Sequence, residues 1–448
     1  MNYKRQVFEI IRQETIGGRP FSRYIQFLGG TTTRQDLELA ARLRVSGETL
    51  IDGPQIAQYE KAFADFLGVK HAVSFGGGRV AFRGILKALG IGVGCDVLVL
   101  GYTCVVVPNA IVSVGARPVY VDLDPKTLGI QAANLESRIT PQTRAILVQH
   151  TLGIPTEMDT VMHLARKHGL AVIEDCAHSL GSTYQGQMAG TFGQAAFFSS
   201  EHSKCISTGL GGMATTSDEA LAQKLRAFQQ TCPFPSRSYV RKLLLQFMAA
   251  GTLLHLPWSG VGRLSYYGAK FLIGYPKSIL PEERKGQWPP GRELRLSNAQ
   301  AALGLSQLEQ LPYSIAHRLA IAQIYEEELV RAVWPVVFPV KTPQTQAVYI
   351  RYPIWIGDNQ MVFRRRRTVL EIGDWFDSPI YLCDDDSRDA VGYQTGSCLA
   401  AEDMTRRIID LPTHLKVPPA VAYATIREII QRYAALAGVP ASTLPTMV

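Results

Sequence analysis

A lysine that follows an apolar run and precedes a glycine-rich turn is the first candidate for chemistry. The segment AAFFSSEHSKCISTGLGGM (195–213) places Lys204 shortly after Ser199 and Ser200. The apolar residues predict a buried strand. An amine just beyond such a strand can be desolvated, become nucleophilic and join an aldehyde as a Schiff base. The two serines can bind phosphate oxygens. Most lysines are solvated surface charges, so only this setting makes Lys204 a candidate.

Acidic residues and a histidine follow a second apolar run. In VIEDCAHS (172–179), Glu174 and Asp175 end the run, and His178 comes three residues after Asp175. Aspartate in such a place commonly caps the N-terminus of a helix. Alternatively, an ionised aspartate held against the nitrogen of a pyridine ring keeps that nitrogen protonated and makes the ring an electron sink.

A glycine cluster supplies a candidate anion site. The segment SFGGGRVAF (74–82) carries three glycines and Arg79 into an expected helix. Backbone N–H groups at a helix N-terminus attract phosphate, glycine lets a ligand approach closely, and arginine adds a two-pronged hydrogen-bond donor. Glycine clusters are usually only turns. This cluster becomes a candidate phosphate site because the segments of Lys204 and Asp175 accompany it.

The elements around these residues alternate between strand and helix patterns. The expected strands are DVLVL (96–100), RPVYVDLD (117–124), RAILVQH (144–150) and LAVIED (170–175), and the expected helices include GRVAFRGILKALG (78–90) and MDTVMHLARKHG (158–169). This alternation predicts an α/β fold with a large, mostly parallel sheet covered by helices. Ligands of such sheets bind beyond the carboxyl ends of the strands, which is where the candidate residues stand.

The chain divides into four predicted parts. These are an N-terminal extension and arm (1–48), a large cofactor-binding domain (49–230), an apolar insertion flanked by basic residues (231–290), and connecting helices with a small C-terminal α/β domain (291–448). The insertion contains KLLLQFMAAGTLLHLPW (242–258) and YYGAKFLIGY (266–275), and neither run is long enough to span a bilayer. Burial at a subunit interface is the favoured interpretation. Peripheral contact with a membrane or a lipid substrate is the alternative. Capping of the active site is a further role that the sequence leaves open for the insertion.

The composition argues against several classes of protein. Of 448 residues, 46% are hydrophobic and 19% charged, which suits a globular protein and not a disordered one. Seven cysteines without a CxxC pair argue against a disulfide framework and a zinc site, so no metal is expected. The N-terminus has no targeting peptide pattern, and a cytoplasmic location is expected. The net charge is +8 and arginines fill 364–367, but no nucleic-acid signature accompanies them, so no nucleic-acid partner is expected.

The ordered motifs resemble the DegT/DnrJ/EryC1/StrS family. The similarity covers 45–230 and 290–330, through LIDGPQIAQYEKAFADFLGVKHAV, GYTCVVVPNAIVSVGARPVYVDLDP, VIEDCAHSLGSTYQG, GTFGQAAFFSSEHSK and LSNAQAALGLSQLEQL. The resemblance implies the fold of type I pyridoxal-phosphate (PLP) enzymes, the aspartate aminotransferase type, and a homodimer with its sites at the subunit interface. It also implies transfer of an amino group from glutamate to a keto-sugar, often nucleotide-linked, for the synthesis of amino sugars, surface polysaccharides or secondary metabolites.

The resemblance assigns catalytic roles to three residues. Lys204 occupies the place of the family's Schiff-base lysine in the pattern FSxxxSK. Asp175 occupies the place of the aspartate that pairs with the ring nitrogen, and His178 that of a Gln or His beside the ring hydroxyl.

The same comparison implies contacts with the cofactor. Ser199 matches a serine that contacts the phosphate, and Gly78 with Arg79 occupies the Gly-Thr of the usual phosphate loop. Cys104 stands where an aromatic residue commonly stacks on the ring, so a smaller group would cover that face. The residues expected to bind PLP are therefore Gly78, Arg79, Cys104, Asp175, His178, Ser199 and Lys204.

The sequence also departs from the family pattern. Arg79 replaces the commoner threonine and is expected to strengthen phosphate binding through a bidentate contact. Leu210 replaces the glutamate of the usual GEGGM. The segment RELR (292–295), with Glu293, replaces a common YNYR near the substrate and the phosphate contacts of the partner subunit. The retained lysine and aspartate imply that the chemistry is intact while the substrate pocket differs.

Two alternatives to amino transfer remain open. A few relatives of this family dehydrate or deoxygenate sugars with PLP, but they replace the lysine with histidine, so the retained Lys204 favours amino transfer. The second alternative is a catalytically silent binding or regulatory protein on the same fold, suggested by Leu210, Cys104 and RELR. Burying Lys204 and Asp175 without a cofactor would be electrostatically unfavourable, which argues against it.

Overall fold

The computed structural model of the protein describes residues 24–45, 49–256, 259–338, 345–364 and 368–436. Residues 1–23, from which the absence of a targeting peptide and most of the N-terminal extension are inferred, lie outside the described residues. Residues 46–48 of that extension and 365–367 of the arginine run lie outside them as well.

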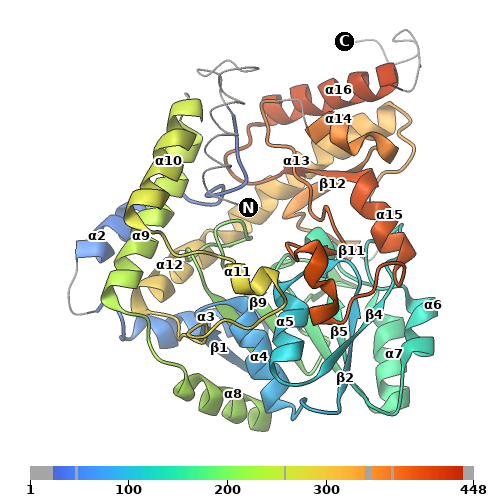
Figure 1. Ribbon diagram of the computed structural model, residues 1–448. Coiled ribbons are helices and arrows are strands. Elements are labelled where there is room, and N and C mark those ends of the chain that lie inside the picture. The colour runs from blue at the N-terminus through green and yellow to red at the C-terminus, as the bar shows by residue number, and fades with distance from the viewer. Residues whose placement is uncertain (1–23, 46–48, 257–258, 339–344, 365–367, 437–448) are drawn as a thin grey trace.

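A seven-stranded sheet forms the centre of the larger lobe (Figure 1). In spatial order its strands are β1 (His71–Phe75), β10 (Gly212–Thr216), β9 (Ala195–Ser199), β6 (Ala171–Asp175), β5 (Thr143–Gln149), β2 (Asp96–Leu100) and β4 (Arg117–Val121). All pairs from β9 to β4 are parallel, whereas β10 is antiparallel to both of its neighbours. The predicted α/β class with a mostly parallel sheet is therefore confirmed.

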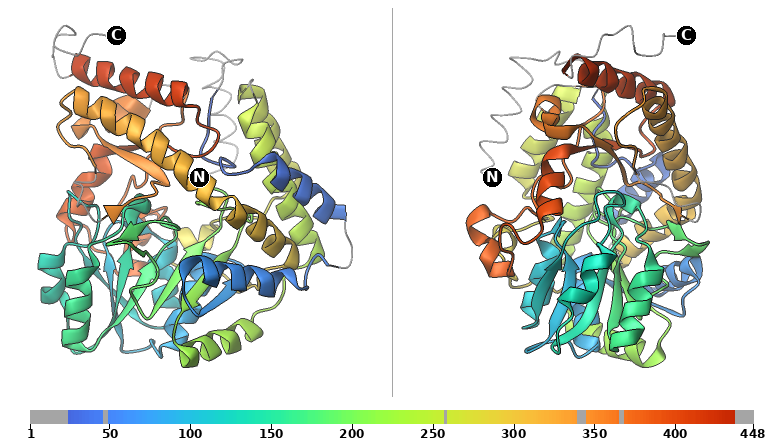
Figure 2. Two further views of the ribbon diagram at one scale, coloured as in Figure 1. Left: turned by 180° about the vertical axis from the view of Figure 1, so that it is seen from behind. Right: turned by 90° about the vertical axis from the view of Figure 1, so that its right-hand side faces the viewer.

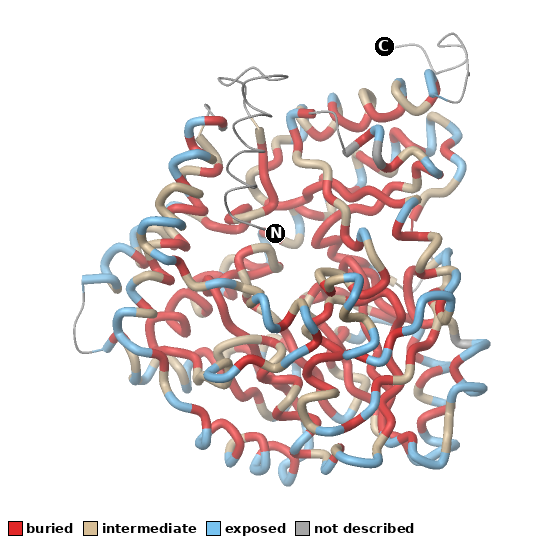
Figure 3. Tube along the Cα trace, in the orientation of Figure 1, coloured by how far each residue is buried: buried red, intermediate tan, exposed pale blue. Residues whose placement is uncertain are grey.

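Helices cover this sheet. Those that contact its strands are α3 (Gln55–Leu67), α4 (Gly78–Ala88), α5 (Val106–Ser113), α7 (Met158–His168) and α8 (Glu219–Thr231). The strands are consequently buried along nearly their whole length (Figure 3), as parallel strands covered on both faces must be. Helix α7 ends at Gly169, which takes the left-handed φ of 64° that glycine adopts without strain.

The C-terminal lobe contains a two-stranded sheet among helices. Its elements are α12 (Asn298–Glu309), α13 (Leu311–Arg331), β12 (Arg351–Trp355), α14 (Gln360–Arg364), α15 (Leu399–Arg407), β14 (Ile408–Pro412) and α16 (Pro419–Leu436). Strands β12 and β14 are antiparallel, and α13 lies along α16 on one side of the lobe (Figure 2). The predicted division of the chain into four parts stays a prediction.

Short strands complete the fold and join the lobes. Strand β3 (Thr103–Cys104) pairs in parallel with β13 (Ile380–Tyr381). Strands β7 (Thr183–Tyr184), β8 (Gln187–Met188) and β11 (Thr345–Gln346) form a small separate sheet. Because β3 belongs to the large lobe and β13 to the small one, their pairing fixes the small lobe beside the carboxyl end of β2.

The described residues of the insertion form three α-helices, α9 (Arg237–Thr252), α10 (Ser259–Ile273) and α11 (Pro281–Arg284), and one 3-10 turn, Leu253–His255. The apolar face of α9 packs against α12 and α2 (Arg34–Val45) of the same chain, where Leu244 and Phe247 join a common cluster. The apolar face of α9 is therefore covered within the chain. The interface and membrane roles expected of the insertion stay predictions.

Helix α10 packs through Tyr266 and exposes its other face. The exposed apolar side chains on that face are Val261, Leu264, Phe271 and Leu272. None of the helices in the described parts of the chain has the length and apolarity needed to cross a membrane.

Candidate active site

A cavity of 870 Å³ lies where the carboxyl ends of the central strands meet the insertion and the small lobe. The residues that the family resemblance marks as catalytic or cofactor-binding all line it: Gly78, Arg79, Cys104, Asp175, His178, Ser199 and Lys204. Ser200, the second serine expected to bind phosphate, does not line it, because its hydroxyl is buried 2.7 Å from Oγ1 of Thr208. The parallel arrangement explains why, since strand ends far apart in the sequence meet at one edge of the sheet.

Lys204 lies in the loop between β9 and β10. Its backbone N–H donates to the carbonyl of Glu201 at 3.0 Å, and its Nζ lies 4.7 Å from the centroid of the Trp375 ring. Burial lowers the pKa of the Lys204 ammonium, and nearby Glu201, Cys104 and Asp175 only partly oppose this effect. A lysine in this state is more often neutral, as a nucleophile or a base must be.

Asp175 is the last residue of β6. Its Oδ1 accepts a hydrogen bond from the N–H of Ala177 at 3.0 Å. Burial raises the pKa of Asp175 to about 6, while the Ala177 N–H, Lys204 and His150 act in the opposite direction. The chain continues into a turn and then β7, not into a helix, so the helix-capping alternative does not apply.

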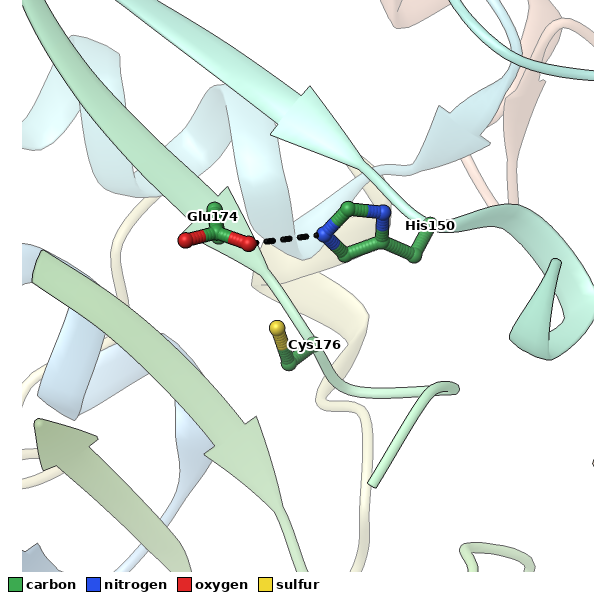
Figure 4. A group of neighbouring side chains, drawn as sticks. All are labelled: His150, Glu174 and Cys176. Carbon is green, nitrogen blue, oxygen red and sulfur yellow. Dashed lines mark hydrogen bonds and ion pairs between the residues drawn. The ribbon is translucent and has the colours of Figure 1, made fainter. Parts of the chain in front are cut away.

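Glu174, next to Asp175, has a structural environment. Its carboxylate accepts hydrogen bonds from the backbone N–H groups of Gly190, Phe192 and Gly193, each at 2.7 Å. It also lies 3.0 Å from Nε2 of His150, beside Cys176 (Figure 4). The Glu174 carboxylate therefore anchors the 190–193 loop, which explains why an acidic residue is buried here.

A hydrogen bond to the second ring nitrogen of His150 shows which tautomer the ring adopts. Nδ1 of His150 accepts a hydrogen bond from the N–H of Thr156 at 3.1 Å. The proton therefore sits on Nε2 and points to Glu174. His150, Glu174 and Cys176 offer metal-ligand atoms within 4.8 Å of one another, but the histidine nitrogens and the carboxylate already have these partners.

His178 is stacked on an aromatic residue of the small lobe. Its imidazole lies parallel to the indole of Trp375, and its Nδ1 accepts from the N–H of Leu152 at 3.4 Å. Burial, with smaller effects of Lys204 and Arg351, lowers the pKa of His178 well below its usual value. The ring is therefore neutral, with its proton on Nε2.

The glycine loop before α4 forms an anion cradle. Gly77 caps α4 without a side-chain hydrogen bond, so the first N–H groups of the helix remain available to an anion. A side chain on Gly78 would lie 3.0 Å from the carbonyl oxygen of Phe198, and one on Gly212 only 2.3 Å from the nitrogen of Gly78. A side chain at position 212 would thus collide with the loop, and one at position 78 would crowd β9, because the loop passes directly over β9 and β10, next to Ser199.

The guanidinium of Arg79 has partners in the insertion. It pairs with Glu283 of α11, and its NH2 donates to the carbonyl of Ser278 at 2.8 Å. Arg292 approaches the other carboxylate oxygen of Glu283 at 3.4 Å, and burial followed by Arg79 lowers the pKa of Arg292 to about 10. The bidentate phosphate contact expected of Arg79 stays a prediction, because this guanidinium already ties α11 to the glycine loop.

The small lobe adds cavity residues that the sequence reasoning missed. Trp375 is one of them, and Arg351 of β12 is another. The Arg351 guanidinium lies 3.5 Å from the centroid of the Trp375 ring and 3.7 Å from that of Phe27, and its NH1 donates to Asp410 at 3.1 Å. The sequence does hold one sign of Arg351, since it is a charged residue inside the otherwise apolar run VYIRYPIWI (348–356).

The unusual family positions also lie at the cavity or next to it. Leu210 lines the cavity, where a glutamate would have placed a charge. Glu293 pairs with Arg83 of α4, and the carbonyl of Leu294 accepts from the N–H of Gly76 at 2.7 Å. The segment 292–295 therefore supports the glycine loop from outside.

Residues 32–431 match the model of the DegT/DnrJ/EryC1/StrS aminotransferase family. The protein belongs to this family. The GDP-perosamine synthase of Caulobacter vibrioides is 35% identical over 306 residues, which cover 68% of this chain and 70% of that protein.

Two solved structures share the fold. DesI, solved in the presence of its TDP-sugar product, aligns with a TM-score of 0.69 at 22% identity, over 94% of this chain and 96% of that one. Spr1654 from Streptococcus pneumoniae, solved in its PLP form, aligns with a TM-score of 0.68 at 19% identity, over 91% and 96% of the two chains. The protein is thus a PLP-dependent aminotransferase of fold type I.

The cavity of this aminotransferase fits PLP. Asp175 offers a buried carboxylate for a ring nitrogen, and Lys204 offers a desolvated amine. The uncapped start of α4, with Ser199 beside it, offers N–H and O–H donors to a phosphate. Each group that the cofactor needs is therefore present in one cavity.

Proposed function

We propose that this aminotransferase moves an amino group from glutamate to a keto-sugar that is nucleotide-linked or otherwise activated. The observation that carries the proposal is that Lys204 and Asp175 line one cavity in a member of this family. The names of its relatives support a sugar acceptor, since one is a GDP-perosamine synthase and another takes part in spore coat polysaccharide biosynthesis.

Lys204 is proposed as the residue that holds the cofactor and moves protons. Bound PLP supplies an aldehyde that joins amines and a ring that accepts electron density. With its lowered pKa, the Lys204 amine takes the proton from the α-carbon of glutamate. In the second half of the reaction the same amine returns a proton to the sugar carbon that receives nitrogen.

Asp175, His178 and Trp375 are proposed to set the conditions for that transfer. Ionised Asp175 holds the proton on the ring nitrogen, which keeps the ring an electron sink. His178 carries its own proton on Nε2 and can donate it to the ring hydroxyl. Trp375 lies beside both His178 and Lys204, so it excludes water from the amine.

We also propose that the protein acts as a homodimer in the cytoplasm. The exposed apolar side chains of α10 support a surface that a second copy covers. Peripheral contact of the same helix with a membrane is the alternative proposal.

The visible absorption spectrum of the purified protein tests the proposed reaction. We expect a yellow band that bleaches with glutamate, and borohydride reduction should then attach the cofactor to a peptide that contains Lys204. Aspartate and glutamine are the control donors. A protein that shows no band after addition of PLP, or whose band ignores every amino donor, would contradict the proposal.

A further inference from the structure

The chain segments that follow β9 and precede β10 run side by side at the cavity. Ser199, the last residue of β9, faces Gly212, the first residue of β10. One position beyond this pair, the N–H of Ser200 donates to the carbonyl of Gly211 at 3.0 Å. The pairing of the two chains therefore extends one residue past both strands.

Glu201 and Leu210 are the next residues on these two chains, and both line the cavity. Leu210 stands where the usual motif of the family has a glutamate. Glu201 places a carboxylate at the matching position of the neighbouring chain. The negative charge that is missing on one chain is thus present on the other.

Glu201 shapes the turn that ends at Lys204. Its Oε2 accepts two hydrogen bonds from Ser203, one from the N–H at 3.0 Å and one from the hydroxyl at 2.6 Å. Its backbone carbonyl accepts the N–H of Lys204 at 3.0 Å. Side chain and backbone of Glu201 therefore act on the same short turn.

The carboxylate of Glu201 is half-buried and charged. Burial raises the pKa of this carboxyl, but the charge of His202, the hydrogen bonds of Ser203 and the charge of Lys204 outweigh it and lower the pKa. Glu201 is consequently ionised at neutral pH.

The charge of Glu201 acts on the amine of Lys204. The titratable groups around Lys204 are Glu201 of its own turn, Cys104 of β3, Asp175 of β6, His178 of the turn after β6 and Arg351 of β12. Burial lowers the pKa of the Lys204 ammonium, and of these groups Glu201 opposes the effect most.

Helix α10 of the insertion brings two more titratable groups towards Glu201. Burial lowers the pKa of Lys270, and Glu201 opposes this effect. Burial also raises the pKa of Tyr266, and Glu201 adds to that effect. Glu201 thus stands between the turn of Lys204 and the insertion.

We propose that Glu201 is a positioning residue for Lys204, which holds the turn that carries the amine and supplies the negative charge that a glutamate at position 210 would supply. The proposal rests on the proposed function, because it takes Lys204 as the residue that holds the cofactor. A nearby negative charge favours the protonated form of a nitrogen. Glu201 thereby keeps a proton on a nitrogen that has to give and take one during amino transfer.

The pH dependence of the visible band tests this role. PLP joined to an amine changes colour when the nitrogen of that amine gains a proton, so the midpoint of the change reports the charge around Lys204. We expect the midpoint of PLP-loaded Glu201→Gln to fall by about one pH unit, because the protonated form loses its nearby negative charge. Glutamine can still accept the hydrogen bonds of Ser203, so the turn is kept while the charge is lost.

A carboxylate returned to the other chain supplies the rescue. The double variant Glu201→Gln/Leu210→Glu should bring the midpoint back towards that of the unaltered protein, whereas Glu201→Gln/Leu210→Gln should not. Glu201→Asp keeps the charge without changing the buried Leu210, and it should titrate close to the unaltered protein.

Glu157→Gln is the matched control, because it removes one negative charge from an exposed side chain that does not line the cavity. Its midpoint should equal that of the unaltered protein. An unchanged midpoint in Glu201→Gln, or equal midpoints in Glu201→Gln and Glu201→Asp, would overturn the role of Glu201. A folded Glu201→Gln/Leu210→Glu protein that titrates as Glu201→Gln does would overturn the equivalence of the two positions.

The same samples separate this role from the proposed function. Borohydride reduction with peptide mapping shows whether the band belongs to Lys204, and addition of glutamate shows whether the protein accepts its amino group. A midpoint that moves as expected in a protein whose band ignores every amino donor supports the role of Glu201 and contradicts the proposed function. A band that bleaches with glutamate but keeps its midpoint in Glu201→Gln overturns the role of Glu201 alone.

Discussion

The imidazole of His178 lies flat against the indole of Trp375, with ring centroids 4.7 Å apart and ring planes inclined by 9°. His178 belongs to the large lobe and Trp375 to the small one, so this stack joins the two lobes inside the cavity. The Nζ atom of Lys204 lies over the same indole. The position of the small lobe therefore determines the surroundings of the proposed catalytic amine.

Replacement of Trp375 by alanine tests that dependence. We expect Trp375→Ala to weaken binding of pyridoxamine phosphate by about fivefold, since an aromatic pair contributes about 1 kcal/mol. It should also raise the apparent pKa of Lys204, because water would reach the amine. Trp375→Phe, which keeps an aromatic face, is the control and should change both quantities less. Equal effects of the two substitutions would contradict a role for the stacked ring.

Replacement of Lys204 by alanine should reduce amino transfer to background, because the protein then lacks the amine that holds the cofactor and moves the proton. The measurement is turnover with glutamate, together with the visible spectrum. Lys224→Ala, which changes an exposed lysine of α8 that does not line the cavity, controls for the loss of one positive charge. Transfer by Lys204→Ala at the native rate would show that another residue carries the chemistry.

The affinity for pyridoxamine phosphate should depend on pH through Asp175. Burial raises the pKa of this carboxyl to about 6, so it is charged above that pH and neutral below it. A protonated ring nitrogen prefers the charged form. Affinity should therefore persist above pH 6 and fall below it, by up to about tenfold per pH unit.

Titrations of Asp175→Asn across that pH range supply the comparison. The variant should bind more weakly and lack this part of the pH dependence. If its slope below pH 6 equals that of the unaltered protein, another group is responsible.

Glu283 should contribute strongly to stability, because its buried carboxylate is shared by Arg79 and Arg292. We expect Glu283→Gln to lower the free energy of unfolding by about 2 kcal/mol, since it leaves two poorly solvated guanidinium groups with a neutral partner. Urea denaturation measures this change. Glu282→Gln, at the exposed neighbouring position of α11, should stay within about 0.5 kcal/mol of the unaltered protein. Equal losses in the two variants would argue against the shared pair.

The exposed face of α10 should be covered in the working assembly. Light scattering should detect a dimer, and Phe271→Asp with Leu272→Asp should weaken it, because a buried unpaired carboxylate is costly. Val93→Asp, at a residue that is 90% exposed and far along the chain, is the control. A dimer that resists the double substitution, combined with flotation of the protein with anionic liposomes, would favour contact with a membrane instead.

Much of the sheet can be predicted because its signals are local. The run 96–100 is β2, and the runs ending at Asp175 and before Lys204 are β6 and β9. Apolar β-branched runs bounded by turns indicate buried strands, and the parallel topology then brings their ends together. The seven site residues consequently meet in one cavity.

The remaining features depend on contacts between distant segments, which no local pattern encodes. Glu283 and Arg79 are 204 positions apart, and nothing in either neighbourhood indicates the other. The apolar face of α9 predicts burial but does not say that α2 is what covers it. Trp375 stands in no strand-like or helix-like sequence pattern. Its contact with Lys204 depends on how the small lobe packs against the large one.

The ion pair between Arg79 and Glu283 limits how the insertion can be transferred to another family member. A family member with the commoner threonine at the place of Arg79 has no guanidinium there to meet the carboxylate of an inserted α11. Transplanting residues 231–290 alone would therefore bury an uncompensated negative charge beside the site that receives the cofactor phosphate. The insertion and the residue at position 79 form one exchangeable module, and a chimera has to carry both.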